Sequence, residues 1–288
     1  MPIPSGALRF NSDSGKLEYY NGEVWWQIDN FSADNATGGA RGVFGGGYTA
    51  PATSFNVIQY ITISSTGNAI DFGDLSAAKG LIGACSSSIR GVFSGGTVVS
   101  APYPKTNVIE FITISSTGNA QDFGDLSVAK QTVAACSSST RGVFGGGYTN
   151  TPAATTFNVI EYITIASTGN AQDFGDLSAA KGSLSACSSS TRGVFGGGFV
   201  TPTVTNVIEF ITISTLGNAS DFGDLLSALR QKAALSSSIR GVFAGGYTPE
   251  TNVIEFVTIL TTGNAQDFGD LIANNALLSA CSNGHGGL

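Results

Sequence analysis

The chain repeats itself five times. An Arg-Gly-Val-Phe block followed by small residues begins at Arg41, Arg90, Arg141, Arg192 and Arg240, and an Asp-Phe-Gly-Asp-Leu block begins at Asp71, Asp122, Asp173, Asp221 and Asp267. Successive copies are 46 to 51 residues apart. A repeat of this length indicates an array of similar units that pack on their neighbours. Residues that recur in every copy are therefore interpreted first as parts of the scaffold.

Each repeat contains four short strand candidates. In the second repeat they are residues 80–86, 91–96, 107–114 and 120–126. Residues 107–114 are rich in β-branched and aromatic side chains, which predicts a strand covered on both faces. The Ser-Ser-Thr-Gly-Asn sequence that follows predicts a hairpin turn. With 39 glycines and only 11% charged residues, the composition favours an all-β fold.

Four antiparallel strands in each repeat predict the blade of a β-propeller, in which sheets pack face to face around an axis. The run Val-Phe-Gly-Gly-Gly-Tyr at Val143 to Tyr148 resembles the diglycine that ends the second strand of Kelch blades. Kelch blades usually carry a Trp after the Tyr of the third strand, whereas Trp25 and Trp26 precede the repeats here. The Phe of Asp-Phe-Gly-Asp-Leu is the expected substitute between blades. The resemblance implies a Kelch-like propeller.

The repeats are out of phase at their two ends. The first begins at the strand candidate 41–47 with no strand before it, and residues 277–282 reproduce that missing strand at the C-terminus. Pairing 277–282 beside 41–47 predicts that residues 41–288 close into a ring of five four-stranded blades without exposed edges. The alternative is a β-solenoid, whose coils are usually shorter and need a cap at each end.

Residues 1–30 are predicted to form a separate N-terminal β module of three strands, followed by a linker at 31–40. The Asn21-Gly22 pair predicts a type I′ hairpin turn. A module of this size is too small to be stable alone, so it must dock on something.

Residues 8–26 resemble the short "fill-in-the-form" segment of phage tail-fibre and related virion proteins. That resemblance implies a virion structural protein, assembled in the host cytoplasm, which binds other virion proteins or forms a homotrimer through this module. The candidate attachment residues are Tyr19, Tyr20, Trp25 and Trp26.

The charge and hydropathy of the chain argue against binding to nucleic acid and against insertion into a membrane. The net charge of −7 disfavours nucleic acid, because binding to phosphates depends on cationic side chains. No apolar run approaches the roughly 18 residues that span a bilayer, so we expect no membrane insertion. The N-terminus also lacks a recognisable secretory signal, which favours synthesis in a cytoplasm.

The sequence predicts no catalytic residue, metal site or cofactor. The paired aspartates suggest calcium or a catalytic carboxylate pair. All five copies keep them beside one Arg, however, so turn capping or Asp to Arg contacts are the simpler interpretation. We expect Lys79, Lys130, Lys181 and Arg230 to neutralise the same aspartates. Cys85, Cys136 and Cys187 share a repeat position with Leu235, and Cys281 fills it in the last partial repeat, which predicts buried structural thiols.

The loop between the second and third strands differs from repeat to repeat. Variation on a fixed scaffold is typical of a binding face. Its aromatic residues could stack on a host glycan or protein, or could only cover the ends of the blades; they are Tyr48, Tyr103, Tyr148, Phe199 and Tyr247. We therefore expect a non-enzymatic tail-fibre or surface-appendage component. The alternatives are a propeller enzyme or lectin that acts on polysaccharide, and an intracellular protein-interaction scaffold.

Overall fold

The computed structural model describes residues 3–11, 16–27, 41–49, 53–98, 102–150 and 152–281. Within these ranges every regular element is a β-strand, and every strand pairing is antiparallel, which confirms the all-β prediction. The chain divides into two compact units, Met1–Gly39 and Ala40–Leu288, and each is described by itself.

The N-terminal unit is a three-stranded meander of β1 (Leu8–Asn11), β2 (Lys16–Tyr20) and β3 (Trp25–Gln27). The predicted two-residue type I′ turn is wrong. Tyr20 pairs with Trp25, so the loop spans residues 21–24. The Asn21 side chain explains the longer loop, because its Oδ1 accepts hydrogen bonds from the backbone N–H groups of Glu23 at 2.9 Å and Val24 at 2.8 Å.

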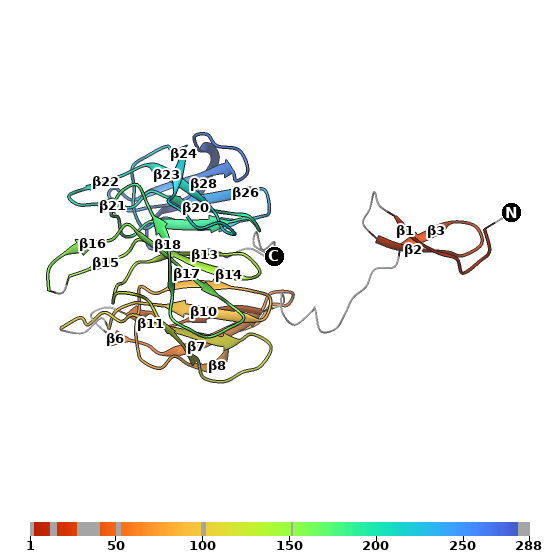
Figure 1. Cartoon of the computed structure of the whole chain (residues 1–288), viewed down its shortest axis with the longest axis horizontal. Helices are drawn as coiled ribbons and strands as arrows, with labels where there is room; N and C mark the ends of the chain where they lie inside the picture. The colour runs from red at the N-terminus through yellow and green to blue at the C-terminus, as the bar shows by residue number, and fades with distance from the viewer. Residues whose placement is uncertain are drawn as a thin grey trace. The chain divides into compact units, whose positions relative to one another are not determined.

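The second unit contains one larger sheet for each repeat (Figure 1). Sheet 1 consists of β4 (Arg41–Gly45), β7 (Val57–Thr62) and β8 (Ile70–Asp74). Sheet 2 consists of β9 (Gly83–Ser86), β10 (Arg90–Ser94), β11 (Val108–Thr113) and β12 (Gln121–Asp125). Sheet 3 consists of β13 (Ala134–Ser137), β14 (Arg141–Gly145), β17 (Val159–Thr164) and β18 (Gln172–Asp176). Sheet 4 consists of β19 (Ser185–Ser188), β20 (Arg192–Gly196), β23 (Val207–Thr212) and β24 (Ser220–Asp224). Sheet 5 consists of β25 (Ala233–Ser236), β26 (Arg240–Ala244), β27 (Thr251–Thr258) and β28 (Gln266–Asn275).

Sheets 2 to 5 are four-stranded meanders in which each strand pairs with its neighbour in the chain. Three of the connecting loops add a small hairpin: β5 (Tyr48–Thr49) with β6 (Thr53–Ser54), β15 (Tyr148–Thr149) with β16 (Thr155–Thr156), and β21 (Phe199–Val200) with β22 (Thr203–Val204). The predicted pattern of four antiparallel strands per repeat is therefore confirmed for these four sheets.

The core consists of four apolar clusters, and each fills the space between two consecutive sheets. One cluster joins Phe72 and Leu75 of the first repeat to Phe93 and Ile112 of the second. The other clusters lie between sheets 2 and 3, sheets 3 and 4, and sheets 4 and 5. Phe72 is buried and stacks edge-on against Tyr60 at 5.9 Å. The repeated Phe is thus a wedge between sheets, as its position in the repeat predicts.

Five residues with the same unusual backbone conformation link consecutive sheets. Four of them lie just before the first strands of sheets 2 to 5, which are β9, β13, β19 and β25. Leu81, Thr132, Ser183, Gln231 and Leu277 all have φ between 54° and 58°. In each consecutive pair the backbone N–H of the later residue donates to the carbonyl of the earlier one, from Thr132 to Leu81 at 3.0 Å through to Leu277 to Gln231 at 3.3 Å. This left-handed conformation costs about 1 kcal/mol or more at a non-glycine residue. The sequence gives no signal for it, since these residues are not glycine or asparagine.

The two ends of the array do not meet among the described residues. Sheet 1 has three strands there, residues 277–281 form no strand, and residue 282 lies outside the described ranges. The predicted pairing of 277–282 with β4 is therefore not present in this part of the chain. Phe44 is 49% exposed, whereas its equivalent Phe93 is 5% exposed, and Phe268 is 54% exposed against 2% for Phe222. Sheets 1 and 5 each leave one apolar face uncovered.

Candidate functional site

The variable loops of the first, third and fourth repeats lie on one side of the unit Ala40–Leu288. In Figure 1 the hairpin strands β6, β15, β16, β21 and β22 project from the same edge, at the left of the view. Of the predicted binding aromatics, Tyr48, Tyr103 and Tyr247 are between 41% and 45% exposed, and Tyr148 and Phe199 are partly buried. The structure thus places these aromatics in the loops between the second and third strands.

Arg230 brings two of these aromatics together. Its guanidinium carbon lies 5.1 Å from the ring centroid of Phe199 and 5.2 Å from that of Tyr247, which is cation–π distance. Its Nε is buried and has no hydrogen-bond partner among the described residues. The equivalent position in the first three repeats holds Gly80, Gln131 or Gly182. An arginine between two loop aromatics is therefore specific to the fourth repeat. Sequence reasoning assigned Arg230 to the aspartates, and that prediction is wrong.

Tyr103 is isolated from this pair and sits on a strained loop. Its φ is 59°, and its carbonyl accepts a hydrogen bond from Lys105 Nζ at 2.6 Å. Partial burial lowers the pKa of the Lys105 ammonium below its ordinary value. The loop of the second repeat therefore has its own shape and its own cation.

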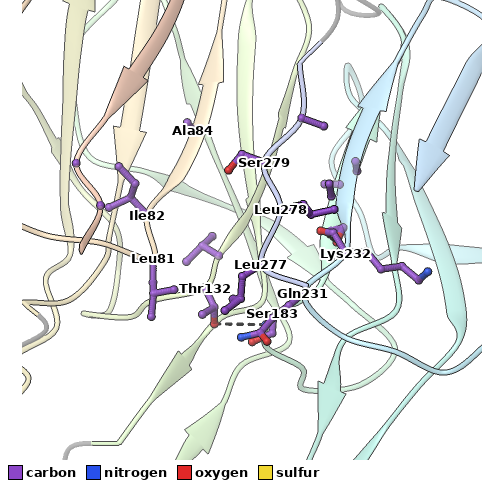
Figure 2. Close-up of a pocket in the computed structure, with 18 of the residues that line it drawn as sticks. Leu81, Ile82, Ala84, Thr132, Ser183, Gln231, Lys232, Leu277, Leu278 and Ser279 are labelled. Carbon is purple, nitrogen blue, oxygen red and sulfur yellow. Dashed lines mark hydrogen bonds between the residues drawn. The ribbon is translucent and has the colours of Figure 1, made fainter. Parts of the chain in front are cut away.

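A cavity of about 850 Å³ in the unit Ala40–Leu288 is lined by residues in or just before the first strands of sheets 2 to 5. Its lining includes Thr132, Ser183 and Gln231, together with residues 43–48 from the start of the repeats and 277–281 from the end. Figure 2 shows Leu277, Leu278 and Ser279 lying between Ile82 on one side and Lys232 on the other. Among the described lining residues the charged side chain is Lys232, whose Nζ contacts Glu255 at 2.8 Å and the Gly245 carbonyl at 2.8 Å. The cavity offers hydroxyl and amide groups and no unpaired carboxylate.

The lysines of the repeats pair with glutamates and not with the expected aspartates. Lys79, Lys130 and Lys181 each follow one sheet and pair with a glutamate on the third strand of the next sheet: Lys79 with Glu110, Lys130 with Glu161 at 2.6 Å, and Lys181 with Glu209. Sheet 4 has Leu229 at this position, and Glu255 pairs instead with Lys232, which directly precedes β25 in the same sheet, at 2.8 Å. Both partners of every pair are buried. The same carboxylates accept backbone N–H groups of the preceding sheet, such as Ser127 to Glu161 at 2.7 Å. The first three ion pairs therefore connect one sheet to the next, and Glu255 makes its connection through the backbone N–H of Leu226 at 2.6 Å. The sequence signal for these pairs is that Lys79, Lys130 and Lys181 recur at one position of the repeat while Glu110, Glu161 and Glu209 recur at another.

The arginines that begin each repeat also form no ion pair with the aspartates among the described residues. Arg90 stacks on the Phe111 ring at 4.3 Å, and its Nη1 donates to the carbonyl of Ile165 in the next sheet at 2.8 Å. Among the described residues no aspartate forms an ion pair. The expected Asp to Arg contact is therefore wrong, because the guanidinium is already used across the sheet interface.

Cys85, Cys136 and Cys187 are unpaired thiols at the interfaces between sheets; Cys136 and Cys187 are buried as predicted, and Cys85 is partly buried. An added Cβ at Gly142 would lie 2.8 Å from Cys85 Sγ, and one at Gly193 would lie 2.8 Å from Cys136 Sγ, so each sulfur sits against a glycine of the next sheet. Burial raises the pKa of the Cys136 thiol to about 12, and it raises those of Cys85 and Cys187 as well. Cys281 is exposed instead of filling the same slot.

The N-terminal meander has one polar and one apolar face. On the polar face Glu18 is buried and accepts hydrogen bonds from Arg9 Nε at 2.8 Å and Asn11 Nδ2 at 2.9 Å. Arg9 lies 4.2 Å from the Trp25 ring, and Tyr20 packs against the same ring at 5.3 Å. The cross-strand pairing Leu8 to Tyr19 to Trp26 forms the other face, which is exposed together with Phe10 and Leu17. The predicted attachment residues thus divide between the faces, Tyr19 and Trp26 on the exposed apolar one.

The described residues contain no cluster of three or more histidine, cysteine, aspartate or glutamate side chains that could hold a metal ion. They also contain no helix with the length and apolar character needed to cross a bilayer. His285, the chain's single histidine, lies outside the described residues. No protein-family model and no curated protein matches the chain.

Proposed function

We propose that the chain is a non-enzymatic virion structural protein, a component of a phage tail fibre or another surface appendage. Its N-terminal meander attaches it to other virion proteins or to further copies of itself, and its loop face contacts the host surface. The observation that carries the proposal is the division of the chain into a uniform scaffold, one variable loop face and a small unit with an exposed apolar face. The resemblance of residues 8–26 to virion segments supplies the location.

We further propose that sheets 1 to 5 are the blades of a closed five-bladed propeller. Phe44 at one end and Phe268 at the other are exposed, although the equivalent side chains at the other interfaces are buried. Burying a large apolar side chain contributes about 1.5–3 kcal/mol, which favours contact between the two faces. Residues 277–282 would then fill the free edge of β4 (Arg41–Gly45) as a fourth strand.

Attachment through the meander follows from its exposed face. Leu8, Phe10 and Trp26 are between 55% and 68% exposed, and a three-stranded sheet of this size has no second apolar layer of its own among the described residues. An apolar face of this kind needs a partner, since contiguous exposed apolar patches mark interaction sites. Trp26→Ser should therefore release the protein from the particle or dissociate its oligomer, whereas Glu23→Gln on the turn should not.

Mass spectrometry of purified phage particles tests the proposal most directly. The expected result is that peptides of this chain copurify with infectious particles through a density gradient, at a fixed ratio to a major structural protein. Peptides confined to the infected-cell lysate, with none in the particles, would instead favour an intracellular scaffold.

A second candidate function is binding of an acidic polysaccharide, as a lectin. Arg230 favours it, because a guanidinium held between Phe199 and Tyr247 keeps a planar donor fork that suits a carboxylate. A glycan array with the purified chain tests this reading. Arg230→Gln should abolish binding to uronic-acid glycans, and Arg240→Gln, which removes an arginine stacked on Phe256 in the fifth repeat, is the matched control. Equal binding by both variants would eliminate the lectin site.

A further inference from the structure

We propose that sheets 5 and 1 pack on each other within one chain, and that Gln59 and Asn275 meet at this joint in place of a lysine–glutamate pair. The inference rests on the closed ring proposed above and names the residues that close it. It concerns the one interface of the ring that the described residues do not form.

The two residues occupy the positions of the buried ion pairs. Glu110 lies opposite Phe93 in sheet 2, and Gln59 lies opposite Phe44 in sheet 1. The carbonyl of Lys79 accepts a hydrogen bond from Gly47, and the carbonyl of Asn275 accepts the equivalent bond from Gly246. Gln59 is thus the sheet 1 counterpart of the glutamate, and Asn275 is the sheet 5 counterpart of Lys79, Lys130 and Lys181. Sheet 4 has Leu229 at this position, and there Lys232 supplies the cation for Glu255.

The two replacements occur on the two faces that a ring would bring together. Both residues are exposed as the array stands, and water solvates glutamate and lysine without cost. An open array therefore gives no reason to lose both charges. A closed joint does, because a buried carboxylate whose lysine has been lost is strongly destabilising. Two amides can instead satisfy one another as donor and acceptor.

A second type of contact leaves the same two faces unmatched. The Nη1 atoms of Arg41, Arg90, Arg141 and Arg192 each donate to an isoleucine carbonyl of the following sheet. Among the described residues Arg240 of sheet 5 has no such bond. The remaining equivalent isoleucine, Ile63 of sheet 1, is 43% exposed, whereas Ile114 is 6% exposed. The unused donor is on sheet 5, and the unused acceptor is on sheet 1.

The turns between third and fourth strands show a third such contact. The backbone N–H of Asp74 donates to Asn119 Oδ1 of the next sheet at 3.1 Å, and Asp125, Asp176 and Asp224 repeat the bond. The unmatched members are Asp270 of sheet 5 and Asn68 of sheet 1. Three independent contacts therefore leave complementary groups on the same two faces.

The chain's own ends, and not those of a second copy, are the occupants that the cavity favours. Residues 43–48 of the first repeat and 277–281 of the last line the same cavity. Figure 2 shows Leu277 and Leu278 between Ile82, which directly precedes β9 of sheet 2, and Lys232, which directly precedes β25 of sheet 5. The two faces already lie at opposite sides of one opening within a single molecule.

Charge substitutions on the full-length chain test the joint by thermal unfolding. Gln59→Glu should lower the melting midpoint by roughly 5–15 °C, because it buries a carboxylate without a partner. Adding Asn275→Lys should restore most of the loss. The matched control is the first interface, where Lys79→Asn should be destabilising and the double change Lys79→Asn with Glu110→Gln should recover.

Two outcomes would overturn the inference. If the Lys79 control behaves as expected and Gln59→Glu melts within about 1 °C of the parent chain, the faces do not meet. If a mixture of the separate Gln59→Glu and Asn275→Lys chains regains the parent midpoint, the partner is a second copy. Neither experiment uses a phage particle or a glycan, so its failure is separate from failure of the virion proposal.

Discussion

Lys79 and Glu110 form an ion pair buried between sheets 1 and 2, although 31 residues separate them in the chain. The Glu110 carboxylate also accepts the backbone N–H of Ser76 at 2.6 Å. Because both donors belong to the preceding repeat, the carboxylate fixes the position of one sheet on the next. Apolar contact alone would allow the sheets to slide.

Lys130→Met tests the worth of this connection at the interface of sheets 2 and 3. It should lower the free energy of unfolding by about 3–5 kcal/mol, since Glu161 is left buried without its cation. The double variant Lys130→Met with Glu161→Leu should recover most of that loss, because apolar residues of similar size replace the whole pair. Urea unfolding followed by circular dichroism measures both. A single variant as stable as the parent would mean that water reaches the carboxylate.

Removing all residues after Ile272 should cause aggregation or a large loss of stability. The deletion takes away Asn275, whose carbonyl accepts the Gly246 N–H at 2.9 Å, and Leu277, which bonds to Gln231. It also takes away the strand expected to complete sheet 1. A shorter deletion of Gly286 to Leu288 is the control and should leave the melting midpoint unchanged. Closure of the ring is disproved if the longer deletion melts like the intact chain.

Gly193→Ala should destabilise the interface of sheets 3 and 4. The new methyl group would lie 2.8 Å from Cys136 Sγ, closer than side-chain carbons approach sulfur in proteins. Overpacking of this kind costs about 1–3 kcal/mol. Cys136→Ala in the same chain should relieve the clash, so the double variant should be more stable than Gly193→Ala alone. Additive losses in this double-mutant cycle would show that sulfur and methyl do not meet.

Thiol reactivity should divide the four cysteines. Cys281 is exposed and should react with a disulfide reagent at pH 8. Cys136 and Cys187 are buried, and the partly buried Cys85 has its sulfur against Gly142, so these three should react only on unfolding. The folded-state pKa of Cys136, about 12, lies above its ordinary 9.0. The associated stability is therefore full below pH 9 and is lost as the pH rises towards 12. Cys281→Ser should abolish the fast phase, and more than one fast thiol in the parent would contradict the assignment.

The strands and their order could be predicted because the signals are local. Residues 107–114 are β-branched and aromatic, and β11 occupies Val108–Thr113. The turn that follows ends in Gly118 with φ of 154°. Five copies of such a pattern leave little freedom in the number of strands. The predicted two-residue turn at Asn21-Gly22 was wrong because the Asn21 side chain accepts hydrogen bonds from the backbone N–H groups of Glu23 and Val24, which stabilises a longer loop.

The contacts between sheets could not be predicted, because they depend on which residues face one another across an interface. The aspartates and lysines lie close in sequence, so pairing them was the natural hypothesis. In the structure Lys130 pairs with Glu161 of the following sheet, and the same carboxylate accepts a hydrogen bond from the backbone N–H of Ser127 at 2.7 Å. Arg230 was grouped with these lysines for the same reason, and only the folded chain shows it between Phe199 and Tyr247.

The glycine slots beneath the buried cysteines have a consequence for the gene. Gly142, Gly193 and Gly241 each receive a cysteine sulfur from the sheet before, so the third, fourth and fifth repeats present the same socket to whichever repeat precedes them. Unequal crossing-over between two coding repeats would therefore produce a junction that already fits. The interfaces that precede the third, fourth and fifth repeats are thus interchangeable at this contact, whereas the joint proposed between sheets 5 and 1 is not.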